Sequence, residues 1–235
     1  MKNILILILL LSINGISQTL GMDEINSSDL HSWNTDNIKE YSGAYSFGYS
    51  ESESELRIFI SDGIICAQIM DYKWSEKFGG FIANYENLEN VKIEGNHFYS
   101  NKSNGEFMEY KTDKSFSVGL LIENPWSYGG QKESEFGQRY PDEEIYLPGI
   151  FSQASTELLK YDSLKLLSSK ELKIMRNEIF ARYDYKFKLD GEMDKYFSKE
   201  KSYHRIYDNV DKWLTEIEKK NIILIQKIEL EKNGL

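Results

Sequence analysis

The stretch SELRIFISDGIICAQIM, residues 54–70, decides the fold of the first half of the chain. Leu56, Ile58 and Ile60 recur at every second position, which is the period of a half-buried β-strand. Asp62-Gly63 then interrupts the pattern before a second apolar run begins. This pair suits a tight type I′ turn, because both central residues of such a turn need a positive φ. The stretch therefore predicts a β-hairpin.

Similar turn signals recur downstream, at Gly95-Asn96 and at Asn104-Gly105, again between short β-type runs. Short strands at this spacing predict an antiparallel meander that folds as a barrel or a sandwich. The expected strands are 42–49, 55–61, 64–70, 79–84, 89–94, 97–101, 106–111 and 116–122.

The composition also divides the chain. All three prolines and four of the glycines lie within residues 125–150, which we therefore interpret as a linker. Residues 18–40 lack sustained periodicity and are interpreted as a spacer. The expected fold class is α+β, with an antiparallel β barrel or sandwich at residues 41–124 followed by a small three-helix domain at residues 151–235.

The first residues have the pattern of a secretory signal peptide. Lys2 supplies a positive charge, Ile4–Ile13 is an almost unbroken apolar run, and small residues lead up to Ser17. A stable membrane span takes about twenty apolar residues, so this run is too short. Cys66 is the only cysteine, so the thiol of a bacterial lipoprotein is missing. We expect residues 1–17 to be removed, giving a secreted or periplasmic protein without a membrane span.

Charge is spread unevenly along the chain. The whole chain carries 28 Lys and Arg against 38 Asp and Glu, and residues 165–235 hold 16 of the basic and 13 of the acidic residues. The acidic excess therefore lies in the first part, which would repel phosphate, so nucleic acid is not expected as a partner. At 40% hydrophobic and 14% aromatic residues, the chain is typical of a globular protein.

The last part has helical periodicity. Ser168 and Glu171 have capping-box spacing at the start of a helix that runs to about Tyr183. A shorter helix is expected at residues 190–200. The final helix begins at Thr215, again with a glutamate at capping-box spacing, and its expected inner face consists of Ile217, Asn221, Leu224, Ile225 and Ile228.

The segments RNEIFARYDYKF, KYFSKEKSY and LTEIEKKNI follow one another between residues 164 and 229. In order and spacing they resemble the YARHG domain, a small bacterial extracytoplasmic module named after a five-residue motif. At that motif this chain has Phe180, Ala181, Arg182, Tyr183 and Asp184, so the Tyr, His and Gly positions differ. The resemblance implies an exported module, often joined to unrelated N-terminal domains, with an uncharacterised activity and a suggested role in cell-envelope binding.

The glycine position of the motif gives a physical expectation. If the helix ends with Asp184 in the left-handed conformation, an aspartate there costs on the order of 1 kcal/mol relative to glycine. The alignment therefore predicts that Asp184→Gly stabilises the domain.

Arg176 lies inside the apolar stripe of its helix, with Arg182 at the border. In the structural interpretation, the guanidinium of Arg176 ties helices together by pairing with a carboxylate or with carbonyl groups of another helix. The functional alternative is a recognition surface for a carboxylated or sugar-containing envelope polymer, because arginines bind carboxylates and aromatic faces stack on sugars. Its residues would be Arg176, Arg182, Tyr183, Tyr185 and Tyr203.

Motifs of catalysis or metal binding are missing from the sequence. There is no nucleophile elbow, phosphate-binding loop, dinucleotide fingerprint or HExxH, and His31, His97 and His204 are far apart. We expect no catalytic residues, metal ligands or cofactor. The expected function is that of an exported non-enzymatic binding protein whose partner is an envelope polymer or another envelope protein. The alternatives are a periplasmic carrier with a small apolar ligand inside a barrel, and a hydrolase with a dispersed active site.

Overall fold

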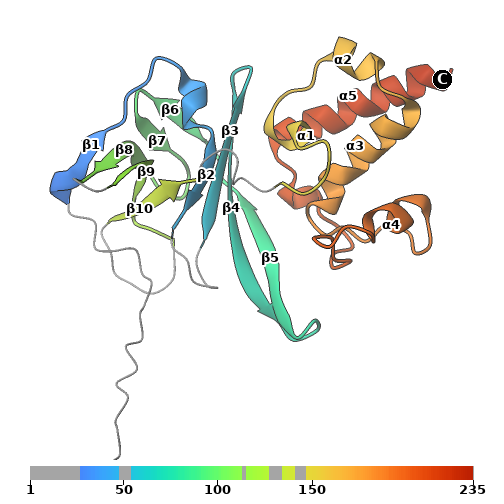
Figure 1. Ribbon diagram of the computed structural model, residues 1–235, viewed down its shortest axis with the longest axis horizontal. Coiled ribbons are helices and arrows are strands. Elements are labelled where there is room, and N and C mark those ends of the chain that lie inside the picture. The colour runs from blue at the N-terminus through green and yellow to red at the C-terminus, as the bar shows by residue number, and fades with distance from the viewer. Residues whose placement is uncertain (1–26, 48–53, 113–114, 127–133, 141–146, 235) are drawn as a thin grey trace, which may run out of the picture.

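The structure is a computed structural model that describes residues 27–47, 54–112, 115–126, 134–140 and 147–234. A curved antiparallel sheet forms the first part and a group of helices forms the second (Figure 1). This arrangement agrees with the α+β class. The signal peptide expected at residues 1–17 lies outside the described residues.

The hairpin predicted from the sequence is confirmed. β3 (Glu55–Ser61) pairs with β4 (Ile64–Ser75), and the register places Ser61 opposite Ile64. Asp62 and Gly63 form the turn with φ of 46° and 80°. Positive φ at both positions is what the Asp-Gly pair predicts.

The described sheet has ten strands. The other eight are β1 (Leu30–Ser32), β2 (Gly43–Ser46), β5 (Gly80–Asn87), β6 (Lys92–Glu94), β7 (His97–Tyr99), β8 (Gly105–Lys111), β9 (Phe116–Glu123) and β10 (Ser134–Arg139). Their order is β5-β4-β3-β2-β10-β9-β8-β7-β6, and β1 pairs with β8. Because β5 and β6 are the ends of this path, the described sheet is open, and a closed barrel is not confirmed.

Two segments expected to be irregular contain strands, so these two assignments were wrong. β1 lies within the expected spacer 18–40, and β10 lies within the expected linker 125–150. β10 fills the place between β2 and β9. Its glycine has a packing role, because a Cβ on Gly137 would lie 2.5 Å from the ring of Phe47. The glycine content that suggested a linker therefore belongs in part to a buried strand.

The turn at Gly95 is confirmed, but the one at Asn104-Gly105 is not. Gly95 connects β6 and β7 with a φ of 60°. Gly105 is instead the first residue of β8, and a Cβ there would lie 2.4 Å from the carbonyl oxygen of Leu121. This glycine allows two strands to approach closely and does not form a turn.

Aromatic side chains fill the core of the sheet. Tyr41, Tyr45, Phe47, Phe98 and Phe107 are each at most 1% exposed. The short 3-10 helix η2 (Ile38–Tyr41) brings the ring of Tyr41 onto that of Phe107, with centroids 4.0 Å apart. Full burial of such a side chain stabilises a fold by about 1.5–3 kcal/mol. The interior of the sheet is therefore a packed core.

Residues 147–234 contain five α-helices where three were expected. They are α1 (Gln153–Thr156), α2 (Tyr161–Lys165), α3 (Ser169–Ala181), α4 (Glu192–Phe197) and α5 (Glu216–Lys232). The two missed helices, α1 and α2, are too short to have a recognisable period. Both predicted capping boxes, at Ser168 and at Thr215, are present. Within the described ranges, no helix combines the length and the apolar composition that a membrane span requires.

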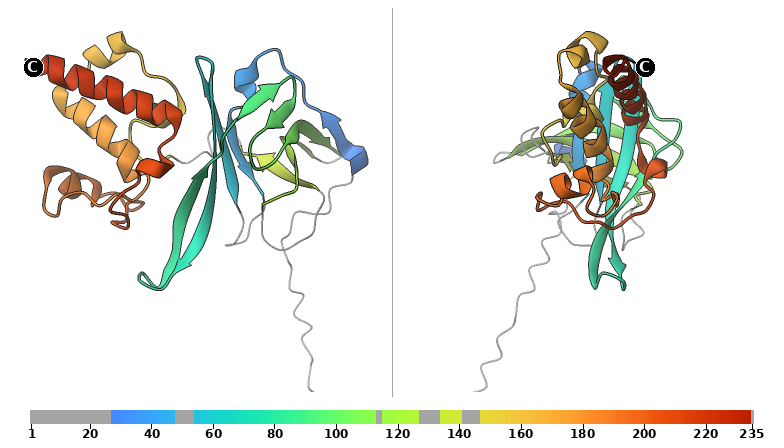
Figure 2. Two further views of the ribbon diagram at one scale, coloured as in Figure 1. Left: turned by 180° about the vertical axis from the view of Figure 1, so that it is seen from behind. Right: turned by 90° about the vertical axis from the view of Figure 1, so that its right-hand side faces the viewer.

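Helices α3 and α5 run side by side and enclose the second core (Figure 2). Ile179 of α3 and Ile225 and Ile228 of α5 are fully buried in it. Leu224, expected on the inner face of α5, is only partly buried, and Ile222 lies in the core instead.

The helical part packs on the outer face of β3, β4 and β5. Phe59 and Cys66 of the sheet form a shared apolar cluster with Ile217 of α5. Polar contacts accompany it: Tyr207 donates a hydrogen bond to the carbonyl oxygen of Ala83 at 2.7 Å, and Gln68 donates one to that of Trp213 at 2.7 Å. Core contacts and hydrogen bonds therefore join the two parts.

Candidate functional site

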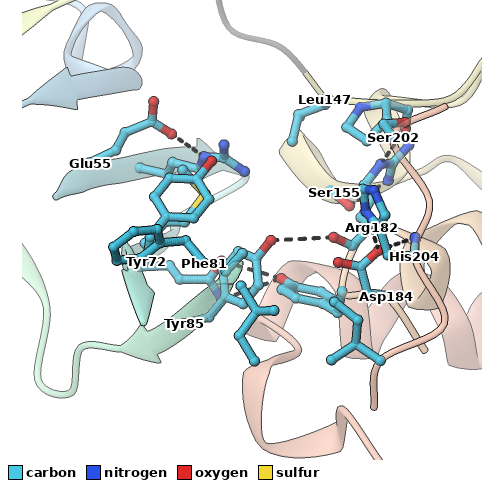
Figure 3. A pocket seen from close by; sticks show the side chains of 18 of the residues that line it. Glu55, Tyr72, Phe81, Tyr85, Leu147, Ser155, Arg182, Asp184, Ser202 and His204 are labelled. Atoms are coloured by element: carbon cyan, nitrogen blue, oxygen red, sulfur yellow. Dashed lines mark hydrogen bonds and ion pairs between the residues drawn. The ribbon is translucent and has the colours of Figure 1, made fainter. Parts of the chain in front are cut away.

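A cleft of about 950 Å³ lies between the outer face of the sheet and the helical part (Figure 3). One wall comes from β3, β4 and β5. The other comes from the end of α3, the segment after α4 and the start of α5. Ligand sites in proteins commonly have volumes of about 300–1,000 Å³. The cleft is therefore the candidate site.

The alternation of β3 decides which of its side chains reach the cleft. Leu56 and Ile58 are fully buried in the core of the sheet. Because successive side chains of a strand point to opposite faces, Glu55, Arg57 and Phe59 line the cleft. β3 thus places a guanidinium group on the cleft wall.

Arg57 has a protein partner on one edge of its guanidinium only. Its Nε donates a hydrogen bond to Glu55 Oε1. No residue in the described ranges accepts a hydrogen bond from Nη1 or Nη2, although only 14% of the side chain is exposed. Burial alone would lower the pKa of Arg57, but the charge of Glu55 and its hydrogen bond outweigh burial and raise it. The group is therefore a fixed cation with unused donors at the cleft.

Arg182, on the opposite wall, is satisfied by the protein. Its Nε donates to the carbonyl oxygen of Pro148 at 3.1 Å, Nη1 donates to Ser155 Oγ at 2.6 Å, and Nη2 donates to Glu178 Oε1. Burial lowers the pKa of Arg182, and the charge of Glu178 opposes that effect. Because all three nitrogen atoms of its guanidinium have protein partners, Arg182 has a structural role in the wall of the cleft.

Glu178 fastens the chain that enters the helical part. Its carboxylate accepts hydrogen bonds from the N–H groups of Ile150 at 2.9 Å and Phe151 at 2.7 Å. Gly149 precedes them with a φ of 110°, and a Cβ there would lie 2.0 Å from the Glu178 carboxyl carbon. Only glycine fits where the backbone packs this closely on the Glu178 carboxyl group. The position of the incoming chain is thus fixed against α3 by one buried carboxylate.

A second buried carboxylate, that of Glu218, holds together three segments of the helical wall. It accepts hydrogen bonds from Tyr183 Oη at 2.8 Å, from the N–H of Thr215 at 2.9 Å and from Ser155 Oγ. Burial raises the pKa of Glu218 more than these hydrogen bonds and the charge of Arg182 lower it. Gln68 Nε2 of β4 lies 3.3 Å from the Tyr183 hydroxyl, so the network continues into the sheet.

Aromatic side chains from the β4–β5 hairpin border the cleft. Tyr72, Phe78 and Phe81 are 46%, 44% and 48% exposed. Deeper in the cleft, Tyr85 donates a hydrogen bond to the carbonyl oxygen of Arg182 at 3.3 Å, and burial raises the pKa of Tyr85. Exposed ring faces can stack on a flat ligand or on the C–H face of a sugar. The cleft thus combines an aromatic border with a cationic wall.

Asp184 has a φ of 56°, so the left-handed conformation expected there is confirmed. Its Oδ1 accepts a hydrogen bond from the N–H of His204 at 2.7 Å. Burial raises the pKa of Asp184 to about 6, against the hydrogen bond and the charge of His204, which lower it. Glycine at this position would relieve the backbone but also remove the acceptor, and each effect is worth about 1 kcal/mol. The stabilisation predicted for Asp184→Gly is therefore offset by a contact that the sequence does not reveal.

The five residues proposed as a recognition surface do not form one surface, although Arg182 and Tyr203 both line a smaller pocket of about 260 Å³ beside the cleft. Arg182 and Tyr183 line the cleft and are buried. Arg176 lies apart, where its Nε pairs with Glu229 of α5 at 2.7 Å. This salt bridge between α3 and α5 is the arrangement that the structural interpretation of Arg176 predicts.

The other two residues of that set hold a loop. Tyr203 Oη donates a hydrogen bond to the carbonyl oxygen of Tyr185 at 2.6 Å. Both rings pack against Phe187. Neither residue is among those that line the cleft.

Sequence reasoning missed the sheet side of the cleft, namely Arg57, Tyr72, Phe78, Phe81 and Tyr85. For Arg57 on β3, Tyr72 on β4, and Phe81 and Tyr85 on β5, the usable signal was strand alternation, which puts large polar and aromatic residues on the face away from the core. That pattern also fits a face exposed to water. Only the packing of the helical part on this face turns it into a site.

Comparisons with known proteins identify the helical part. Residues 149–230 match the family model of the YARHG domain, so the chain contains a YARHG domain at its C-terminal side. The match extends the resembling segment to Gly149 and includes the chain that Glu178 holds. The N-terminal region matches no family model. No curated protein and no solved structure matches the chain.

The side chains that line the cleft indicate which ligand chemistry it suits. Within the described ranges, no group of three or more His, Cys, Asp or Glu side chains could hold a metal ion. What the cleft offers is a cation with free donors, several hydroxyl groups and exposed aromatic rings. These groups suit recognition of a polar ligand that carries a negative charge.

Proposed function

We propose that the protein is an exported, non-enzymatic binding protein of the cell envelope, and that its ligand occupies the cleft between the sheet and the YARHG domain. The observation that carries the proposal is the cleft, because its walls come from both parts of the chain and the buried network of Tyr183, Glu218 and Gln68 links them. A site assembled before the ligand arrives loses little entropy on binding.

Export is proposed from the signal-peptide pattern of residues 1–17. The partner is an envelope polymer or another protein of the envelope. A carrier with an apolar ligand inside the sheet has less support, because the interior is filled by buried aromatic side chains such as Tyr45, Phe98 and Phe107.

The test is a pull-down of residues 18–235 on purified cell wall and on envelope extract. We expect retention by the wild-type protein and loss of retention in Phe81→Ser, which removes a ring at the border of the cleft. Phe116→Ser is the matched control, because Phe116 is 63% exposed on β9 and does not line the cleft. Absence of retention, or equal retention by both variants, would contradict the proposal.

A further inference from the structure

We infer that the cleft binds a saccharide through a carboxylate group and that Arg57 anchors this carboxylate. The inference rests on the proposed function only for the choice of the cleft as the ligand site. It assigns a ligand chemistry and an anchoring residue, which lies outside the YARHG domain.

The first argument is the state of the Arg57 guanidinium. Glu55 engages Nε and leaves both terminal nitrogens without a protein acceptor within the described ranges. Only 14% of the side chain is exposed, so the ion pair with Glu55 holds the guanidinium in a fixed position, while its terminal nitrogens remain accessible from the cleft. A ligand carboxylate in the cleft would supply the missing acceptors, and the guanidinium fork favours two parallel hydrogen bonds to it.

The second argument is the charge of the walls. Three arginines line the cleft, namely Arg57, Arg182 and Arg205. Arg182 is satisfied by protein acceptors, and Arg205 pairs with Asp194 at 2.9 Å and donates to the carbonyl oxygen of Phe187 at 3.1 Å.

The carboxyl groups on these walls balance the three arginines. They belong to Glu55, Asp184 and Glu218. Arg57 is the arginine of the cleft whose two terminal nitrogens both lack an acceptor among the described residues, whereas the unpaired donor of Arg205, Nε, is buried beside Asp194. One such guanidinium suits a ligand with one negative charge. A phosphate dianion would meet too little positive charge, since phosphate sites usually combine several cationic or backbone donors.

The third argument is the aromatic border. Tyr72 and Phe81 project from neighbouring strands into the cleft, as Figure 3 shows, and about half of each side chain is exposed. A ligand with a purely apolar body would favour a closed pocket, whereas exposed rings suit a ligand with one apolar face and a hydrated edge. A pyranose ring has this character. The hydroxyl group of Ser202 on the other wall offers a partner for its hydroxyls.

The test is calorimetric titration of residues 18–235 with soluble probes. The probes are galacturonate, N-acetylmuramic acid, the methyl esters of both, and glucose 1-phosphate. We expect at least one acid to bind with a Kd about tenfold lower than that of its ester, because the ester cannot form the charge-assisted pair. Glucose 1-phosphate should bind more weakly than that acid.

Three variants connect the selectivity to its residue. Arg57→Gln should abolish the difference between acid and ester. Arg57→Lys keeps the charge but loses the fork, so it should retain only part of the difference, and it also serves if Arg57→Gln fails to fold by circular dichroism. Phe81→Leu should weaken acid and ester to the same extent, and Phe116→Leu should change neither.

The inference would be overturned if neither acid binds more tightly than its ester, if glucose 1-phosphate binds best, or if acid selectivity persists in Arg57→Gln. Failure of the proposed function looks different. Cleft-dependent retention on envelope material without acid selectivity would refute only the ligand chemistry. Acid selectivity that depends on Arg57, without any retention on envelope material, would refute only the envelope partner.

Discussion

Arg182 should be the most costly polar side chain to remove from the YARHG domain. In Arg182→Ala, the carboxylate of Glu178 would lose its cation while remaining in a site where only 2% of its side chain is exposed. Removing one partner of a buried ion pair typically costs about 3–5 kcal/mol. The hydrogen bonds to Pro148 and Ser155 are lost as well, but the contributions overlap, so we expect a loss of about 4 kcal/mol. Natural domains have a total stability of about 5–15 kcal/mol, so the variant should be close to unfolding.

Urea unfolding followed by tryptophan fluorescence measures this loss, since Trp213 lies where the two parts meet. Arg176→Ala is the matched control. Its ion pair with Glu229 is more exposed, at 23% and 15% of the two side chains, so it should lose only about 1 kcal/mol.

A double variant tests the cause of the loss at Arg182. Adding Glu178→Gln to Arg182→Ala removes the unpaired charge and should restore part of the stability. The reasoning would be refuted if Arg182→Ala costs no more than Arg176→Ala, or if the added Glu178→Gln substitution lowers stability further.

Three further predictions concern charge and backbone. The folded-state pKa of Asp184 is about 6 and exceeds the ordinary value of 3.8, so the free energy of unfolding should fall as the pH rises from 3.8 to 6. Asp184→Asn keeps the acceptor for His204 and the left-handed conformation, and a smaller fall in a pH series of thermal melts would be the expected result. Glu218→Gln should likewise reduce the loss of stability above pH 4.5, because burial raises the pKa of Glu218; an unchanged pH profile would contradict this. Gly149→Ala should lower the free energy of unfolding in urea by more than about 2 kcal/mol, because a Cβ there would collide with Glu178. Gly63→Ala, at a φ of 80° but with open space around the Cβ, should lower it by about 1 kcal/mol. Equal losses would contradict the close packing of Gly149 on Glu178.

The parts of the fold that the sequence predicts correctly depend on local rules. Asp62-Gly63 needs only the conformation of two residues, and Ser168 with Glu171 needs only one helical turn. The sheet depends on pairing between distant segments, so β10 was not recognised. Its Gly137 resembles a linker residue in the sequence, whereas in the structure it makes room for the ring of Phe47. Local composition cannot distinguish these two uses of glycine.

The candidate site likewise has residues that the sequence identified and residues that it did not. Arg182 and Tyr183 were identified because they follow directly from a helix with clear periodicity, and in the structure they are buried in the wall of the cleft. Arg57 was missed because an arginine between Leu56 and Ile58 reads as the outward position of an ordinary strand. Arg57 is buried because the YARHG domain covers that face of the sheet. The sequence of β3 alone does not reveal this packing.

The departures of this chain from the naming motif of the family have local compensation in the structure. Tyr183 stands at the histidine position of the motif, and its hydroxyl donates to Glu218 at 2.8 Å, so a polar donor is present there without a group that titrates near neutral pH. Asp184 stands at the glycine position with a φ of 56°, and its side chain binds the N–H of His204, which offsets the backbone cost. Arg182, which matches the motif, holds Glu178 and Ser155 together. In this chain, the residues of the motif therefore help to build one wall of the cleft, whereas the donors proposed to bind the ligand belong to Arg57 of the sheet.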